Sequence, residues 1–128
     1  YTVSRQYSSR DMELLAKLVY AESRGEPYIG QVAVAATVIN RVNSPIYPNT
    51  IPEVIFQIEN GYYQYCSVRE GQIYLTPNDI ARNAALDAVF GWDPSNGALT
   101  FYNPRFTTNK WVLTRPYCTT IGNHIFVK

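Results

Sequence analysis

The chain has 128 residues, of which 46% are hydrophobic and 16% charged, enough apolar material for the core of one compact domain. Its formal net charge of +1 gives no electrostatic argument for binding nucleic acid or an anionic membrane, and no apolar run reaches the ~18 residues that span a bilayer. The 11 tyrosines, 5 phenylalanines and 2 tryptophans suit sugar rings, and they also suit protein interfaces. Because the chain does not begin with methionine, we expect residues 1–128 to be one domain, excised or processed from a longer protein.

The first predicted element is a helix that follows a short lead-in over residues 1–7. Ser8 is a suitable N-cap, and Asp11 falls in the first turn. Gly25 and Pro27 both stop helices, so we expect the helix to end near Gly25.

A glutamate on the apolar face of this helix is the first candidate functional residue. Leu15, Leu18 and Val19 lie seven, four and three residues before Glu22, and residues at these spacings share one helical face. Burial and the negative end of the helix dipole both raise a carboxyl pKa, so Glu22 is a candidate acid at neutral pH. A structural role is the alternative, because inward-facing glutamates also occur in hydrogen-bonded networks. Glu26, one turn further on, is expected in a solvated loop.

Three further helices are predicted in the first two thirds of the chain. Residues 30–42 have small and branched apolar residues at helical spacing, and residues 52–57 follow a capping box. A third helix is expected from Thr76 as N-cap to Gly91. Its expected core face consists of Ile80, Ala81, Ala84, Ala85, Ala88 and Val89. Residues 59–75 are poorly periodic and are expected to form an irregular loop.

The C-terminal part changes to short β-branched or aromatic runs. Residues 98–103, 111–114 and 124–127 are separated by turn signals and are predicted to form a small antiparallel sheet. Trp92, just after the last helix, is expected in the core. Helices come first and a sheet comes last, so the predicted fold class is α+β.

The histidine and cysteine content argues against a metal site. His124, Cys66 and Cys118 do not have a zinc spacing, and no glycine-rich phosphate loop occurs, so we expect neither metal nor cofactor. The cysteines can form one disulfide or stay free. A cysteine nucleophile with His124 as base remains an alternative, although neither cysteine is followed by a predicted helix start that would lower its pKa.

The distribution of carboxylates limits glycosidase chemistry. Ordinary glycosidases place a second carboxyl group across the scissile bond. No pattern marks Glu26, Glu59, Glu70 or Asp93 as facing Glu22. A single-carboxylate reaction, in which the substrate supplies its own nucleophile, is therefore the form of glycosidase chemistry that the sequence leaves.

Several motifs occur in an order that is typical of one family. They are AESRGEPY at 21–28, GQVAVAA at 30–36, NRV at 40–42, GWDP at 91–94, FYNP at 101–104 and IGNHIF at 121–126. Together they resemble the SleB/CwlJ cell wall hydrolases, the spore cortex-lytic enzymes of endospore-forming bacteria. The resemblance runs from about residue 11 to residue 126 and is weakest over residues 57–72, which we expect to form a cleft wall.

The resemblance implies a fold similar to the lysozyme-like lytic transglycosylases and resuscitation-promoting factors. In those proteins a helix-terminal glutamate followed by serine and glycine is the single general acid/base, and Glu22 matches that position. Tyr102 and Asn103 resemble a Tyr-Asn pair that lines the cleft. Trp111 and Tyr28 offer aromatic faces on which sugar rings can stack, with core packing as the alternative.

The implied substrate is the peptidoglycan glycan of the spore cortex, which carries muramic δ-lactam. The implied reaction cleaves the β-1,4 bond between N-acetylmuramic acid and N-acetylglucosamine and leaves a 1,6-anhydromuramic end. An extracytoplasmic location in the spore cortex or envelope follows, with an unidentified spore protein as a possible partner. The alternatives are a hydrolytic muramidase, a cysteine amidase acting on stem peptides, and a non-catalytic wall-binding module.

Overall fold

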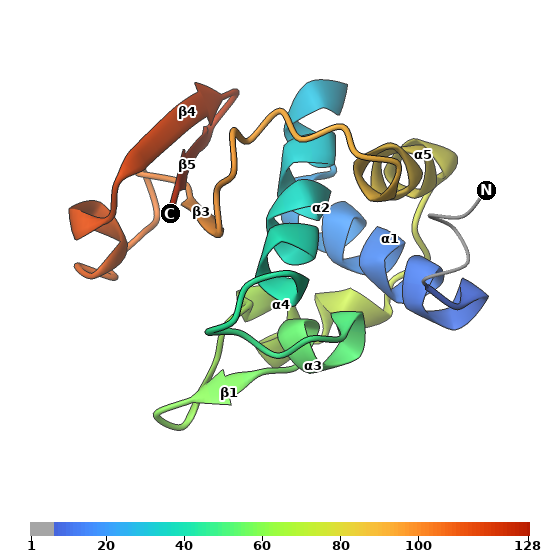
Figure 1. Cartoon of the computed structure of the whole chain (residues 1–128), viewed down its shortest axis with the longest axis horizontal. Helices are drawn as coiled ribbons and strands as arrows, with labels where there is room; N and C mark the ends of the chain where they lie inside the picture. The colour runs from blue at the N-terminus through green and yellow to red at the C-terminus, as the bar shows by residue number, and fades with distance from the viewer. Residues whose placement is uncertain (1–6) are drawn as a thin grey trace.

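The structure is a computed structural model that describes residues 7–128, so nearly all of the expected lead-in over residues 1–7 lies outside the described residues. Long helices form one side of the molecule, short elements lie below them, and a small sheet stands at the other side (Figure 1). In chain order the elements are α1 (Ser9–Ser23), α2 (Tyr28–Val42), α3 (Ile51–Ile55), β1 (Ile58–Glu59), β2 (Tyr62–Tyr63), α4 (Cys66–Arg69), the 3₁₀ helix η1 (Gln72–Tyr74), α5 (Asp79–Val89), β3 (Thr100–Tyr102), the 3₁₀ helix η2 (Val112–Thr114), β4 (Tyr117–Ile121) and β5 (His124–Val127). Within the described range, no helix has the length and apolar character that a membrane crossing requires.

Helix α1 begins as the sequence predicts. The Ser8 side chain accepts a hydrogen bond from the Asp11 N–H at 3.0 Å, which satisfies one of the free donors of the first turn. Leu15, Leu18 and Val19 are fully buried, so the predicted apolar face is confirmed. The helix ends two residues before Gly25, and α2 starts almost at once.

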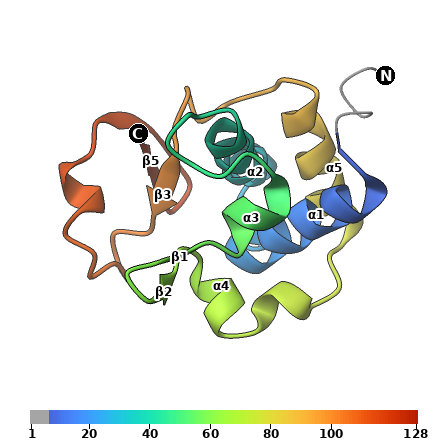
Figure 2. The ribbon, with the colours of Figure 1, turned by 60° about the horizontal axis from the view of Figure 1, so that its bottom comes forward.

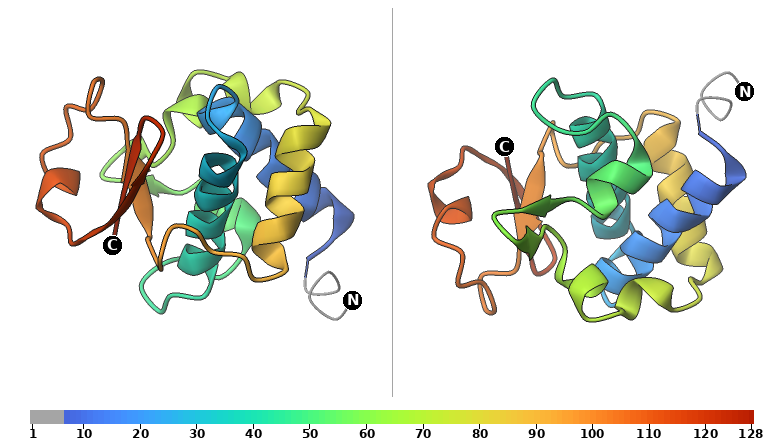
Figure 3. Two further views of the ribbon diagram at one scale, coloured as in Figure 1. Left: turned by 90° about the horizontal axis from the view of Figure 1, so that it is seen from above. Right: turned by 90° about the horizontal axis from the view of Figure 1, so that it is seen from below.

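Helix α2 is apolar on nearly all sides because it lies between two layers. Val32 and Ala35 pack into the main core with α1, α3 and α5. Ala33 and Val34 face the other way and pack with Phe126 of the sheet. Seen from above, α2 separates the sheet from α1 and α5 (Figure 3, left). A helix in that position needs apolar residues beyond a single stripe.

The C-terminal sheet is antiparallel, with strand order β3-β5-β4. The strands expected over 98–103 and 124–127 are confirmed, although β3 is shorter than predicted. The strand expected over 111–114 is wrong, because residues 112–114 form η2. The missed strand β4 pairs with β5 through a tight turn that contains Gly122, whose φ is +56°.

Residues 59–75 are not an irregular loop, so that expectation is wrong. Strands β1 and β2 form a hairpin whose turn residues, Asn60 and Gly61, have φ of +53° and +82°. An Asn-Gly pair with both φ values positive is typical of a tight hairpin turn. Helices α4 and η1 follow, and the hairpin extends below the sheet end of the molecule (Figure 2).

Helix α5 starts two residues later than predicted. The N-cap is Asn78, not Thr76, and its side-chain oxygen accepts a hydrogen bond from the Ala81 N–H at 2.9 Å. The buried alanines of α5 pack against α1 and α2. Ile80 lies beside this contact and is half exposed, so the prediction that Ile80 belongs to the core face is wrong. Trp92 is also 46% exposed, where the sequence favoured the core.

Candidate active site

A cleft of about 700 Å³ lies between the helical part and the sheet. One wall comes from the end of α1 and the segment that links β2 to α4, and the other from β3 and the loop after it. Its charged, aromatic and other polar lining includes Glu22, Glu26, Arg41, Tyr63, Tyr65, Cys66, Tyr102, Asn103, Phe106 and His124. This volume lies within the range of ligand-binding clefts, which is about 300–1,000 Å³.

Glu22 lies in this cleft, in the last turn of α1, and is partly buried. Its Oε2 accepts a hydrogen bond from the Ser67 N–H at 3.3 Å, at the start of α4. Burial raises the pKa of Glu22, hydrogen bonding from Ser67 opposes the rise, and the charge of Glu70 adds to it, with a net pKa above the ordinary value. In the described part of the chain no arginine or lysine forms an ion pair with Glu22. This environment favours a protonated carboxyl group and excludes an ion pair within the described residues, while the bond from Ser67 at the start of α4 is a structural contact of the kind that the alternative expected.

Glu26 is not a freely solvated loop residue, so that expectation is wrong. Its two carboxylate oxygens accept hydrogen bonds from the backbone N–H and the side-chain amide of Asn123, both at 2.9 Å. Burial works against ionisation of Glu26, but the bonds from Asn123 outweigh it and the pKa lies below its usual range. Glu26 therefore stays ionised and joins the α1–α2 turn to the β4–β5 turn.

The structure brings Tyr102 and Asn103 to the cleft together with Glu22. Tyr102 ends β3, and Asn103 begins the loop that follows it. The side-chain oxygen of Asn103 accepts a hydrogen bond from the Arg105 N–H at 3.0 Å, which fixes the start of that loop. The amide nitrogen of Asn103 remains available to a ligand as a donor.

Tyr28 and Trp111 do not line the cleft. The Tyr28 hydroxyl donates to Asp87 on α5, and its ring lies 6.3 Å from that of Trp92. Burial and the Asp87 carboxylate raise the pKa of Tyr28 to about 12. The Arg115 guanidinium lies 5.2 Å from the ring of Trp111. The placement of both aromatic residues therefore gives no support to sugar stacking in this cleft.

Sequence reasoning missed several side chains of the cleft, namely Arg41, Tyr63, Tyr65 and Phe106. Tyr63 and Phe106 are 43% and 77% exposed and present aromatic rings along the cleft walls. The Asn-Gly turn of the hairpin is a sequence signal that locates Tyr63. Arg41 is a charge among the apolar residues of α2, which is a signal for a buried polar role.

The cysteines are both free, so the disulfide alternative is not realised. Cys66 is the first residue of α4, contrary to the expectation that no helix starts beside a cysteine. Burial, Glu22 and Glu70 nevertheless raise the pKa of the Cys66 thiol, and burial raises that of Cys118. No hydrogen bond joins His124 to either thiol in the range that the structure covers. These thiols lack the low pKa of a cysteine nucleophile.

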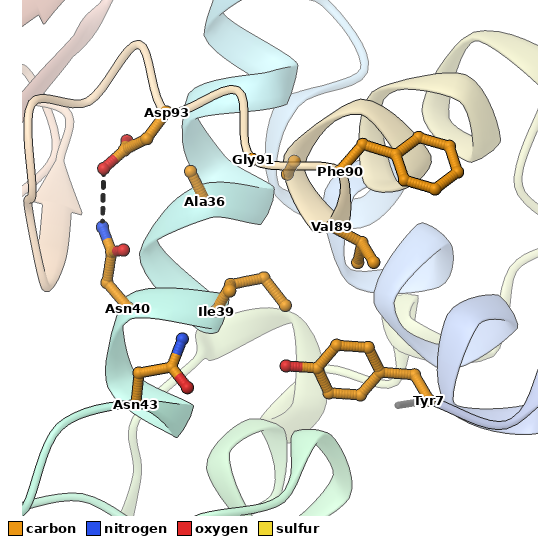
Figure 4. A pocket seen from close by; sticks show the side chains of 10 residues that line it. Tyr7, Ala36, Ile39, Asn40, Asn43, Val89, Phe90, Gly91 and Asp93 are labelled. Atoms are coloured by element: carbon orange, nitrogen blue, oxygen red, sulfur yellow. Dashed lines mark hydrogen bonds between the residues drawn. The ribbon is translucent and has the colours of Figure 1, made fainter. Parts of the chain in front are cut away.

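A second cavity, of about 310 Å³, shares no lining residue with the cleft. It lies between the ends of α2 and α5, with Asn40, Asn43 and Tyr7 at its edge (Figure 4). Asp93 accepts hydrogen bonds from the Ser95 hydroxyl, from the Asn40 side chain and from the N–H groups of Gly97 and Ser95, which hold its pKa below the usual range against the effect of burial. Its carboxylate thus has structural partners. Across residues 7–128 no three His, Cys, Asp or Glu side chains come together as a metal site.

Comparison with known proteins identifies the family. The family model described as Cell Wall Hydrolase matches residues 25–127. The chain belongs to the cell wall hydrolase family. The spore cortex-lytic enzyme of Bacillus cereus is 52% identical over 126 residues, which are 98% of this chain and 47% of the relative. That of Bacillus subtilis strain 168 is 50% identical over 94% of this chain and 38% of the relative. The chain therefore spans about half the length, or less, of these curated relatives.

Solved structures of this hydrolase family have the same fold. The catalytic domain of the germination-specific lytic transglycosylase SleB from Bacillus anthracis matches with a TM-score of 0.87 at 52% identity, covering 95% of this chain and 97% of that domain. The catalytic domain of the Bacillus cereus SleB protein matches with a TM-score of 0.84 at 54% identity, covering 95% and 92%. The predicted SleB/CwlJ resemblance and the predicted α+β fold class are confirmed.

Proposed function

We propose that this cell wall hydrolase domain cleaves the peptidoglycan glycan of the spore cortex during germination, with Glu22 as its single general acid/base. The observation that carries the proposal is the state of Glu22: a carboxyl group in the cleft, with a raised pKa and no cationic partner in the described chain. The names of the similar proteins, a spore cortex-lytic enzyme and a germination-specific lytic transglycosylase, support the choice of substrate.

The proposed reaction is transglycosylation at the β-1,4 bond between N-acetylmuramic acid and N-acetylglucosamine. Protonated Glu22 donates its proton to the glycosidic oxygen as the bond from that oxygen to muramic C1 breaks. The resulting carboxylate then accepts the proton of the muramic C6 hydroxyl while the C6 oxygen bonds to C1. Glu22 ends protonated, and the product has a 1,6-anhydromuramic end.

This scheme needs no second catalytic carboxylate. The attacking hydroxyl belongs to the same sugar, and well-aligned intramolecular attack has an effective molarity on the order of 10⁵ M or more. Glu26 is the other acidic residue that lines the cleft, and both of its carboxylate oxygens already accept hydrogen bonds from Asn123. The raised pKa of Glu22 suits a group that starts the cycle as an acid at neutral pH.

The finer features of the substrate belong to the same proposal. Tyr102 and Asn103 contact the glycan along the cleft, and the substrate is cortex that carries muramic δ-lactam. The site of action is extracytoplasmic, in the spore cortex or envelope, with a spore protein as partner. Neither Tyr28 nor Trp111 is assigned a substrate contact, because both lie outside the cleft.

A hydrolytic muramidase acting on the same bond is the second candidate. One observation favours it: Glu26 is an ionised carboxylate in the same cleft as Glu22, so a carboxylate and an acid are both present. In this candidate, Glu26 would exchange one of its hydrogen bonds from Asn123 for a water molecule and accept a proton from that water. The water oxygen would bond to C1 as the bond from C1 to the glycosidic oxygen breaks, and Glu22 would protonate the leaving oxygen. This candidate predicts reducing muramic ends in place of anhydro ends.

The test of the proposal is Glu22→Gln, compared with Glu59→Gln as a matched control. Glu59 is exposed on β1 and does not line the cleft, so the control makes the same chemical change elsewhere. We expect release of soluble muropeptides from cortex to fall by at least about a thousandfold for Glu22→Gln, because both proton transfers lose their carrier. Wild-type release by Glu22→Gln, with an unchanged thermal midpoint, would contradict the role of Glu22.

A further inference from the structure

Two buried hydrogen-bond donors in the cleft wall have no partner. Arg41, in the last turn of α2, is 3% exposed, and Tyr65, just before α4, is 4% exposed. The Nη1 of Arg41 and the hydroxyl of Tyr65 are shielded from solvent and form no hydrogen bond within the described chain. Both side chains line the cleft that contains Glu22. Buried polar groups without partners are rare and costly, and neither the fold nor the chemistry of Glu22 accounts for this pair.

The surroundings of Arg41 hold it in place but do not balance its charge. Its Nε donates to the Leu99 carbonyl oxygen. Its guanidinium carbon lies 4.7 Å from the ring centre of Tyr47 and 5.3 Å from that of Tyr65. No carboxylate forms an ion pair with Arg41 within residues 7–128. Among the described residues the Arg41 guanidinium has one carbonyl acceptor and two aromatic neighbours, and its Nη1 still has donor capacity for a ligand oxygen.

Tyr65 connects this cation to the proposed catalytic acid. Burial raises the pKa of Tyr65, the charge of Arg41 lowers it and that of Glu22 raises it again, so the hydroxyl lies within electrostatic reach of both. The hydroxyl stays protonated and is a donor. Arginine can only donate hydrogen bonds, and the protonated Tyr65 hydroxyl offers a second donor. The pair therefore selects an acceptor oxygen and disfavours an amine or a cation.

We propose that Arg41 and Tyr65, when a shift of the cleft wall exposes their free donors, form an acceptor subsite that binds an amide carbonyl oxygen of the sugar next to Glu22. The identity of the ligand rests on the proposed function, because an amide carbonyl is the strongest neutral acceptor that N-acylated sugars carry. Two sources share this chemistry: the 2-acetamido group, and the carbonyl of the lactyl-derived group on muramic acid. Binding either one orients the sugar ring relative to the Glu22 carboxyl group.

The test compares Tyr65→Phe with Tyr47→Phe. Both changes remove one hydroxyl from a ring that stacks on Arg41, but Tyr47 does not line the cleft. Binding of N-acetylated chitotetraose is measured by calorimetry, with the de-N-acetylated tetramer as ligand control. Cortex cleavage gives kcat and KM separately. The thermal midpoint of each variant reports on the fold.

We expect Tyr65→Phe to keep or raise the thermal midpoint, because the removed hydroxyl had no partner. We also expect it to weaken a substrate interaction by about tenfold, the effect of one lost hydrogen bond, while Tyr47→Phe stays within about twofold of wild type. Weaker chitotetraose binding assigns the acetamido group. A raised KM for cortex with chitotetraose binding unchanged assigns the lactyl-derived carbonyl.

Three results would overturn the subsite. The first is Tyr65→Phe matching Tyr47→Phe in both binding and KM. The second is a clear fall in the thermal midpoint of Tyr65→Phe, which would give the hydroxyl a structural partner. The third is a wild-type protein that binds neither probe nor cortex. If chitotetraose binding depends on Tyr65 while wild-type protein leaves cortex intact, the subsite stands and the proposed function fails.

Discussion

Gly122→Ala is the perturbation that most directly tests how the sheet is fixed to the end of α1. Gly122 lies in the β4–β5 turn with φ of +56°, and an added Cβ would overlap Oε1 of Glu26 and stand 3.0 Å from Cδ of Pro27. The Glu26 carboxylate accepts two hydrogen bonds from Asn123. The substitution therefore forces apart the contact that joins this turn to the segment after Glu22.

The expected cost has two parts. Alanine in the left-handed region costs about 1 kcal/mol relative to glycine. Displacing the Glu26 carboxylate weakens two charge-assisted hydrogen bonds at a partly exposed site, which adds about 1–2 kcal/mol. The sum, about 2–3 kcal/mol, corresponds to a fall of about 6–12 °C in the thermal midpoint for a domain of this size.

Thermal unfolding followed by circular dichroism, with Gly71→Ala as control, measures this cost. Gly71 has a φ of +82° and nothing within 4 Å of an added Cβ, so alanine there meets at least as much backbone strain but no overlap. We expect Gly71→Ala to lose only about 3–5 °C. Combining Gly122→Ala with Glu26→Ala removes the overlap with Oε1 of Glu26. The thermal midpoint of the double variant should therefore fall by less than the sum of the falls of the two single variants. If Gly122→Ala proves no less stable than Gly71→Ala, the overlap with Glu26 does not destabilise the fold and the expected cost is wrong.

The other predictions concern protonation and contacts outside the reaction. Because the pKa of Glu22 is raised and its protonated form starts the reaction, activity should fall as pH rises through that pKa, and Glu70→Gln should move the fall to lower pH in a pH–rate profile. Stability should depend on pH in the same direction, because the folded protein favours protonated Glu22 more than the unfolded chain does. The free energy of unfolding of the wild type should therefore fall relative to that of Glu22→Gln as pH rises through the raised pKa. Thermal midpoints measured over a pH series test this. Tyr28→Phe should cost about 1 kcal/mol through loss of the Asp87 bond and leave cortex cleavage within about twofold, as melting and turnover assays would reveal. Iodoacetamide should alkylate Cys66 more slowly than a free cysteine at pH 7, because the raised pKa of Cys66 leaves less thiolate. Mass spectrometry that follows alkylation over a pH series measures this, and fast alkylation at pH 7 would contradict it.

The helical half of the fold could be predicted well from the sequence because its signals are local. The cap of α1 and the periodic apolar residues of α1 and α2 act within a few turns, and the structure follows them, although α2 starts at Tyr28 rather than at residue 30. Errors arose where nearby signals competed. Thr76 and Asn78 both suit an N-cap, and the packing of α5 on its neighbours selects Asn78. Strand β4 was missed although its tyrosine, threonines and isoleucine favour a strand, because its pairing with β5 is irregular between Tyr117 and Thr119 and its burial does not alternate.

The candidate site was predictable only where one element determined it. Glu22 followed from the face of a single helix, and the structure puts that carboxyl group in the cleft. Sequence does not indicate which neighbour the Tyr28 hydroxyl meets, and here it donates a hydrogen bond to Asp87 on α5. Arg41 and Tyr65 were missed because their shared position in the cleft depends on how α2 packs against the segment before α4.

We propose Glu22 as the single acid/base, with the nucleophile supplied by the substrate. Mass analysis of the fragments released from purified cortex tests it most directly. We expect wild-type protein to release fragments with 1,6-anhydromuramic ends and Glu22→Gln to release none. Fragments that carry only reducing muramic ends would contradict the single-carboxylate mechanism and favour water activated beside Glu26.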